Sequence, residues 1–138
     1  MVELTRSFEL ENKPVDEDHR GLIALVNDII KVLDEGRPEE CAQLVPDFVA
    51  FTKKHFQREE ALLERYDYPQ LAKHREHHRR LHDNLENLLK LAANVTESEP
   101  ARQSLRKELV YFMMDDVINA DLDFKPFLSE AATDDATE

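Results

Sequence analysis

The sequence predicts an all-α fold: an up-down-up-down antiparallel four-helix bundle that follows an N-terminal arm. Three observations predict it. Apolar residues recur at helical spacing along most of the chain, prolines separate these stretches, and only two glycines occur in 138 residues. Folds rich in β-hairpins rarely tolerate so few glycines, because tight hairpin turns depend on them. Helices joined by short loops pack as a bundle, and the chain length suits a single domain over residues 1–138.

The N-terminal part of the chain predicts an extended arm over residues 1–15 and a first helix over about 16–35. Asp16 and Asp18 are both suitable N-caps, since a short carboxylate side chain accepts hydrogen bonds from free backbone N–H groups. Gly36 predicts the C-terminal end of this helix. Its apolar side chains recur at spacings of three and four residues: Leu22, Ile23, Leu25, Val26, Ile29, Ile30 and Leu33.

Prolines punctuate the other three helices, which we predict over about 38–66, 69–93 and 100–125. A proline suits the first turn of a helix, because its missing N–H is not needed there. Pro46 lies inside the second range, where an interior proline costs about 3 kcal/mol. We therefore expect either a kink at Pro46 or a helix that begins near it. Pro126 is expected to end the last helix or to offset a short final segment.

The composition excludes several classes of function. The net charge is −12, from 18 Lys and Arg against 30 Asp and Glu, which disfavours binding to nucleic acid or to anionic lipid. No apolar stretch approaches the roughly 18 residues of a membrane span, and the N-terminus lacks the apolar region of a secretory signal. We therefore expect a cytoplasmic protein. Cys41 is the single cysteine, so neither an internal disulfide nor a cysteine-based zinc site is expected.

Two pairs of potential metal ligands occur at a spacing of four residues. HFQREE places His55 before Glu59, and KHREHH places His74 before His78. Residues four apart share a helix face, and two imidazoles on one face can hold a metal ion. Both pairs lie on or beside the apolar stripe of their helix. Because buried imidazoles and carboxylates are costly unless they are paired or metal-bound, the two pairs together favour a metal site inside the bundle.

The first and last helices offer further polar residues for such a site. His19 continues the apolar face of the first helix, although in the first turn it could also be solvated. Asp116 and Asp121 border the apolar stripe of the fourth helix. Five residues turn an α-helix by roughly 140° beyond a full turn. The two aspartates would therefore share a face only if the helix ended or bulged between them.

These residues resemble the hemerythrin family, in its single-domain bacterial form, bacteriohemerythrin. HFQREEALLERYDYPQLAKHREHHRRL is similar to the family's central HFxxEE…YPxxxxHxxxH block. VDEDHRGLIALVN resembles the first ligand segment of the family. FMMDDVINAD resembles the fourth-helix signature WLxxHIxxxD, with Phe112 in place of the Trp, Asp116 in place of the His, and Asp121 as the final Asp.

The resemblance implies a non-haem centre of two iron ions inside the bundle. One iron would be held by His74, His78 and Asp116. The other would be held by His19 and His55, and would keep an open position for O2. Imidazole and carboxylate groups suit iron.

The resemblance further implies that Glu59 and Asp121 bridge the two irons, beside an oxo or hydroxo bridge. The function that it implies is binding of O2, or of a related small diatomic ligand, for carriage and transport, storage or sensing. It does not identify a redox partner.

Several alternatives remain open. Asp116 could turn away from the metal, or Asp115 could replace it, and the site could hold one metal, or manganese or zinc. The extra carboxylate also favours a di-iron enzyme, such as an oxidase, a peroxidase or a nitric-oxide-handling protein. A ferritin-like site is disfavoured, because no Glu has a His three residues after it. A metal-free bundle would leave buried carboxylates uncompensated. His77 and His82 lie off the motif spacing and are expected at the surface or beside the ligands.

Overall fold

The computed structural model of the chain describes residues 13–119, 121–122 and 125–126. Within these ranges the regular structure is helical and contains no strand. The elements are α1 (Lys13–Asp34), α2 (Pro38–Arg65), α3 (Leu71–Asn94), α4 (Glu99–Tyr111) and a π-helix, η2 (Phe112–Asn119), which continues α4 directly.

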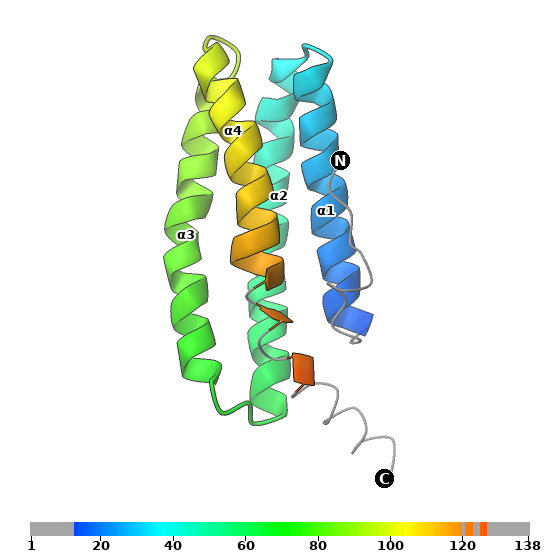
Figure 1. Cartoon of the computed structure of the whole chain (residues 1–138), viewed down its shortest axis with the longest axis vertical. Coiled ribbons are helices and arrows are strands. Elements are labelled where there is room, and N and C mark those ends of the chain that lie inside the picture. Colours follow the sequence, from blue (N-terminus) through cyan, green and yellow to red (C-terminus); the bar gives the residue numbers. More distant parts are fainter. Residues whose placement is uncertain (1–12, 120, 123–124, 127–138) are drawn as a thin grey trace.

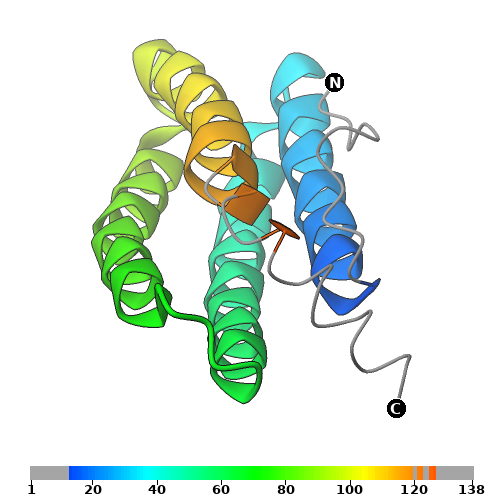
Figure 2. The same ribbon diagram turned by 60° about the horizontal axis from the view of Figure 1, so that its bottom comes forward.

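The helices lie side by side along one long axis, and consecutive helices run in opposite directions (Figure 1). Each helix packs against the next, and α4 together with η2 packs against α1 and closes the bundle. Figure 2 shows the helices gathered around a common interior. The predicted all-α four-helix bundle is therefore confirmed. Among the described helices, none is long and apolar enough to cross a membrane.

The first helix begins earlier than expected and ends at the expected turn. α1 starts at Lys13, so Asp16 and Asp18 lie inside the helix and neither is its N-cap. Residues 1–12 of the expected arm lie outside the described residues. Gly36 has a φ of +73°. Its N–H donates to the Leu33 carbonyl, and the next N–H donates back to Val32, which is the pattern of a Schellman C-cap.

The second helix runs without interruption through its internal proline. α2 begins with Pro38 in its first turn and contains Pro46, so the helix does not begin near Pro46. Pro46 is exposed. The free-energy cost of its missing N–H and of its steric clash with the preceding turn is therefore not offset by burial of its ring in the core. α4 begins at Glu99, where the Ser98 side chain caps the helix by accepting from the Ala101 N–H at 3.2 Å.

The fourth helix changes its hydrogen-bonding pattern in the middle of its predicted range. The α-helical pattern ends at Tyr111, and Phe112–Asn119 form a π-helix. A π-helix bonds each N–H to the carbonyl five residues back, so residues five apart return to nearly the same side. Positions 116 and 121 were expected to share a face only with such a departure from the α-helix. The side chains of Asp115 and Asp116 lie outside the described residues, so the ligand role of Asp116 stays a prediction.

Two apolar clusters fill the interior, and a polar layer separates them. The larger cluster occupies most of the bundle; its largest buried members include Leu22, Phe48, Leu85, Leu105 and Met113. The smaller cluster is built on Val15 and Leu63. Along α1, α2 and α3 the buried histidines and Glu59 occupy the turns between these two clusters. The fold therefore places polar groups within an otherwise apolar interior.

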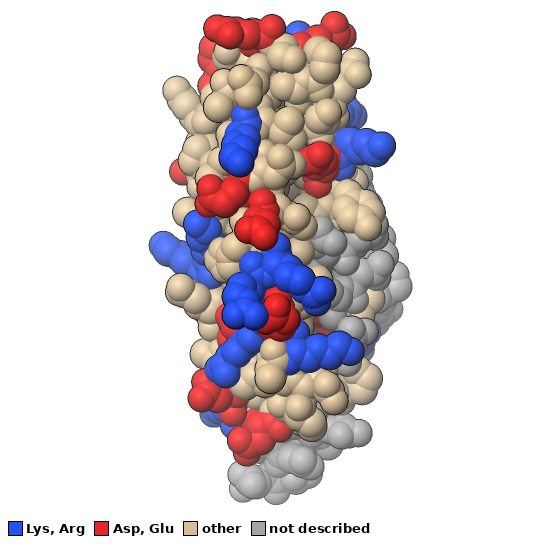
Figure 3. Space-filling model, turned by 90° about the vertical axis from the view of Figure 1, so that its left-hand side faces the viewer, with Lys and Arg blue, Asp and Glu red and all other residues tan. Residues whose placement is uncertain are grey.

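The outer face of α3 carries acidic and basic groups side by side (Figure 3). Arg75 lies 3.0 Å from Glu64, and Arg79 pairs with Glu76 on the next turn. The exposed arginines of α3, Arg75 and Arg79, are thus interleaved with carboxylates on a solvated, mixed-charge surface, whereas His74 and His78 on the same helix are buried.

Replacing the internal proline of α2 is expected to stabilise the protein. Pro46→Ala restores a good helix former at an exposed interior position, and the gain exceeds the entropic advantage that proline gives by restricting the unfolded chain. We expect the free energy of unfolding to rise by about 1–2 kcal/mol, measured by urea denaturation. Gln43→Ala, at another exposed position of α2, is the control and should change stability by less than about 0.5 kcal/mol. An unchanged or lower stability for Pro46→Ala would contradict this expectation.

Candidate metal centre

Six buried polar side chains meet at one level of the bundle. α1 supplies His19, α2 supplies His55 and Glu59, α3 supplies His74 and His78, and the segment after η2 supplies Asp121. The pairs on α2 and α3 are each four residues apart, so each pair projects from one helix face. His74 is the most exposed of the six, at 8%.

The two carboxylates lie between the histidines of different helices. Glu59 Oε2 is 2.9 Å from His55 Nε2, and Glu59 Oε1 is 3.1 Å from His78 Nε2 and also contacts His74 Nε2. Asp121 Oδ2 is 2.8 Å from His19 Nε2, and its Oδ1 is 3.4 Å from His74 Nε2. Each carboxylate therefore faces imidazoles on both sides of the layer.

The six side chains form two overlapping groups of potential ligands. In the first, ligand atoms of His19, His55, Glu59 and Asp121 all lie within 4.8 Å of one another. In the second group, ligand atoms of His74, His78 and the same two carboxylates also lie within 4.8 Å of one another. Two adjacent cation positions would thus share Glu59 and Asp121, while each position would have its own pair of imidazoles.

The donor set fits a metal ion. Among the described residues, four buried side-chain atoms make no hydrogen bond: His19 Nδ1, His55 Nε2, Glu59 Oε2 and His78 Nδ1. Two of these, His55 Nε2 and Glu59 Oε2, lie 2.9 Å apart on neighbouring turns of α2 without forming a hydrogen bond. Buried polar atoms almost always have a partner, and a cation between them would satisfy both. Imidazole nitrogen and carboxylate oxygen suit iron, as well as zinc and manganese.

The electrostatics of the cluster depend on the balance between burial and pairing. Burial disfavours the charged imidazolium and acts to lower the pKa of His74, but hydrogen bonds to Asp121 and Glu59 raise it to about 10. The pKa of His55 is raised well above its ordinary value against the same effect of burial, chiefly by the charge of Glu59. Burial acts to raise the pKa of Asp121, yet hydrogen bonds with its neighbours hold it well below the usual range. Without a metal, protons on these histidines balance the carboxylates.

Residues outside the predicted ligand set lie directly around the cluster. Asp18 Oδ2 is 2.9 Å from His55 Nδ1, and Arg58 donates to Asp18 from the outside. Burial acts to raise the pKa of Asp18, but these hydrogen bonds lower it to about 2. Phe56 stacks on His78 with ring centroids 4.0 Å apart. The Asp18 contact spans α1 and α2, so no spacing within one helix could have revealed it.

The remaining candidates of the sequence lie outside the cluster. His82 is exposed and His77 is half-buried; neither belongs to the two groups of potential ligands. Cys41 is buried, and burial raises the pKa of its thiol to about 11, so it is uncharged at neutral pH.

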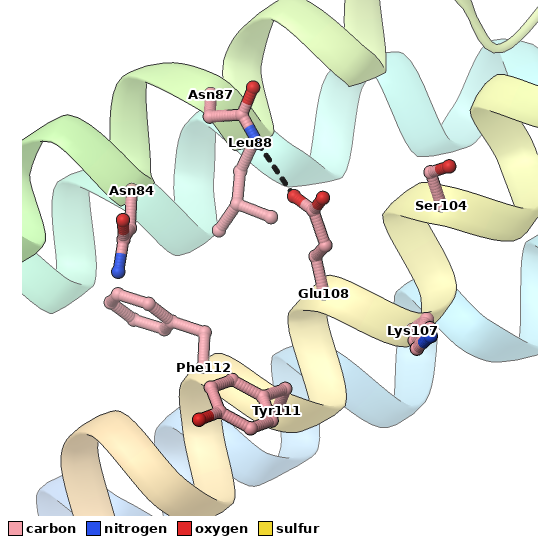
Figure 4. Close-up of a pocket in the computed structure, with 8 residues that line it drawn as sticks. All are labelled: Asn84, Asn87, Leu88, Ser104, Lys107, Glu108, Tyr111 and Phe112. Carbon is pink, nitrogen blue, oxygen red and sulfur yellow. Dashed lines mark hydrogen bonds between the residues drawn. The ribbon is translucent and has the colours of Figure 1, made fainter.

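Two pockets differ in their relation to the cluster. A pocket of about 260 Å³ between α1 and α2 is lined by His55, Glu59, Asp18 and Arg58 among others, and so reaches the candidate ligands from the surface. A larger pocket, of about 480 Å³, lies between α3 and α4 (Figure 4). None of the six clustered residues lines it, and the Asn87 amide donates across it to Glu108 at 2.6 Å.

Comparison with known proteins identifies one family. A family model described as the hemerythrin HHE cation-binding domain matches residues 12–122. This range is more than half of the chain, and it contains all six clustered side chains. No curated protein was found to match the chain.

Metal binding to the cluster is expected to release protons. Because the pKa of His74 is about 10 and that of His55 is also raised, both are protonated in the metal-free protein at neutral pH, and a metal must displace these protons. The apparent affinity for Zn²⁺ should therefore rise as the pH rises from about 6 towards 10. Calorimetric titration in buffers of different ionisation enthalpy should show about two protons released per chain. A pH-independent affinity without proton release would contradict this prediction.

Proposed function

Because the chain belongs to the hemerythrin HHE cation-binding family, we propose that its buried cluster holds two iron ions and binds O2 reversibly, in carriage, storage or sensing. One observation carries the proposal: two groups of potential ligands overlap at Glu59 and Asp121. A single mononuclear site would need only one of these groups. Two carboxylates shared between two pairs of imidazoles suit a pair of metal ions instead.

The residues divide naturally between the two ions. His19 and His55 would hold one iron, His74 and His78 would hold the other, and both carboxylates would lie between them. Asp116, at the position of the family's histidine, is our predicted additional ligand beside His74 and His78. The ion beside His19 and His55 would then have fewer protein ligands and an open position. A pair of ferrous ions held there would supply the electrons for binding O2 without a haem.

The chain itself orients these ligands and limits the access of water. The larger apolar cluster begins one turn from the ligands, at Leu22 and Phe56, and Leu63 closes the other side; all three are buried. Glu59 and Asp121 offset the positive charge of the ions inside this apolar surrounding. The pocket of about 260 Å³ between α1 and α2 leaves one approach from the surface to His55 and Glu59.

A second candidate function is a di-iron enzyme, such as an oxidase, a peroxidase or a nitric-oxide-handling protein. It is favoured by the sequence difference at Asp116, because an additional carboxylate makes the donor set more anionic and favours the higher oxidation state of the metal.

We further propose that the protein works in the cytoplasm with O2 or a related diatomic gas as its ligand, without nucleic acid or membrane. The net charge of −12 supports the absence of an anionic partner.

Anaerobic reconstitution with ferrous iron tests both candidates. We expect two iron ions per chain by elemental analysis. Air should then produce a near-ultraviolet and visible charge-transfer band, and removing O2 should return the reduced spectrum. Irreversible conversion to the ferric form with turnover of peroxide would support the enzyme instead. The control is Glu59→Ala, which should bind less iron. Failure of the unaltered protein to bind iron would refute both candidates.

The charge at position 116 should set the reduction potential. Asp116→His replaces a carboxylate with a neutral imidazole and leaves the site more positive, so the reduced state becomes easier to form. We expect the potential of the iron-loaded protein to rise by about 60 mV or more, which is tenfold in a one-electron equilibrium. Asp115→His tests the alternative ligand at the neighbouring position. Equal potentials for the unaltered protein and Asp116→His would rule out ligation by Asp116.

A further inference from the structure

A carboxylate lies directly behind one of the candidate ligands. His55 points its Nε2 into the cluster, where Glu59 Oε2 is 2.9 Å away. Its other ring nitrogen, Nδ1, lies 2.9 Å from Asp18 Oδ2 on the neighbouring helix α1. A carboxylate accepts hydrogen bonds only, so the proton of this contact belongs to His55 Nδ1. In the neutral imidazole, once the second proton has left, Nε2 then carries the lone pair that a metal ligand requires.

Asp18 is itself held in place from the outside. Arg58 donates from Nε to Asp18 Oδ2 at 2.9 Å and from Nη2 to Asp18 Oδ1 at 2.8 Å. A two-pronged contact of this kind fixes the plane of the carboxylate as well as its position. The guanidinium also lies over the ring of Phe51, 5.7 Å from its centroid, which adds a cation–π contact on α2. The side chain of Asp18 is only 15% exposed, whereas that of Arg58 is 51% exposed.

This arrangement distinguishes His55 from two other candidate ligands. His19 Nδ1 and His78 Nδ1 are buried and make no hydrogen bond among the described residues. Glu60 Oε2 lies 3.6 Å from His78 Nδ1, which is beyond hydrogen-bond distance. His55 also lines the pocket between α1 and α2 together with Asp18 and Arg58. The imidazole next to this opening is therefore braced by an ion pair between Asp18 and Arg58.

We infer that Asp18 is a positioning residue, clamped by Arg58, which fixes the tautomer and the ring orientation of His55 towards a metal in the cluster. The inference rests on the proposed function, since it concerns a ligand of that centre. Carboxylates that accept from the second nitrogen of a ligating histidine orient the ring and make it a stronger donor, and their loss lowers metal affinity by about 10–100-fold. Arg58 acts one step further out, because it holds the carboxylate and does not touch the cluster.

Metal binding by the full chain tests this assignment, with Co²⁺ as a spectroscopic probe. Asp18→Ala should weaken Co²⁺ binding by about 10–100-fold and shift the visible absorption of the bound ion. Asp18→Asn should retain part of the affinity, because its amide oxygen can still accept from His55 Nδ1. Arg58→Ala should give a smaller loss than Asp18→Ala, since the carboxylate remains but is no longer clamped.

The chain offers a matched control on the opposite side of α1. Asp34 pairs with Arg106 of α4, and the side chain of Arg106 is 51% exposed, as is that of Arg58. Asp34→Ala therefore removes an exposed ion pair between helices that lies outside the cluster. It should leave the Co²⁺ affinity and spectrum unchanged and cost little stability, because Asp34 is itself 51% exposed.

A second readout does not depend on affinity. In the Zn²⁺-loaded protein, long-range ¹H–¹⁵N spectra should show a slowly exchanging proton on His55 Nδ1, assigned with His55→Gln. This signal should disappear in Asp18→Ala and persist in Asp34→Ala. An unchanged spectrum and affinity in Asp18→Ala would overturn the positioning role and leave the proposed function intact. If Asp18→Ala does not fold, Asp18→Asn and Arg58→Ala decide the question by the same readouts. Absence of metal binding in the unaltered protein would overturn both proposals.

Discussion

The structure depends on one constraint: four imidazoles and two carboxylates are buried at a single level of an apolar bundle. Removing such groups from water is costly unless their charges are balanced. Glu59 and Asp121 meet this constraint because each faces histidines from more than one helix. The apolar clusters on both sides then exclude water from the layer. In the metal-free protein, protons on the histidines balance the charge of the carboxylates and so stabilise the fold. The same protons occupy nitrogen atoms that a metal needs, so they compete with metal binding.

Much of this arrangement follows from patterns within single helices. The spacing of four residues from His55 to Glu59 and from His74 to His78 was sufficient to place each pair on one face. Their position on the apolar stripes predicted burial, which the structure confirms. The fold class followed from the same periodicity and from the scarcity of glycine. The apolar faces of the first and last helices also pointed to His19 and Asp121, and the resemblance to a family assigned them as ligands, which no local spacing could establish.

Other features could not be predicted because they arise between helices or from small energy differences. The contact of Asp18 with His55 requires the α1–α2 packing, and sequence alone had suggested only a helix cap for Asp18. The uninterrupted course of α2 through Pro46 reflects packing of the surrounding turns, which outweighs the local penalty of the proline. The π-helix was anticipated only as a condition for Asp116 and Asp121 to share a face. Its exact extent depends on backbone bonding that residue preferences barely encode.

The π-helix also makes the centre sensitive to chain length in a way that composition does not reveal. In an α-helix each inserted or deleted residue rotates everything beyond it by about 100°. The π-helix Phe112–Asn119 sets the rotation of the chain between the packed face of α4 and Asp121. Substitutions that preserve the apolar contacts of this segment leave the register intact, whereas a change of one residue in its length turns Asp121 away from the histidines. The position of Asp121 therefore depends more strongly on the number of residues in this segment than on their identity.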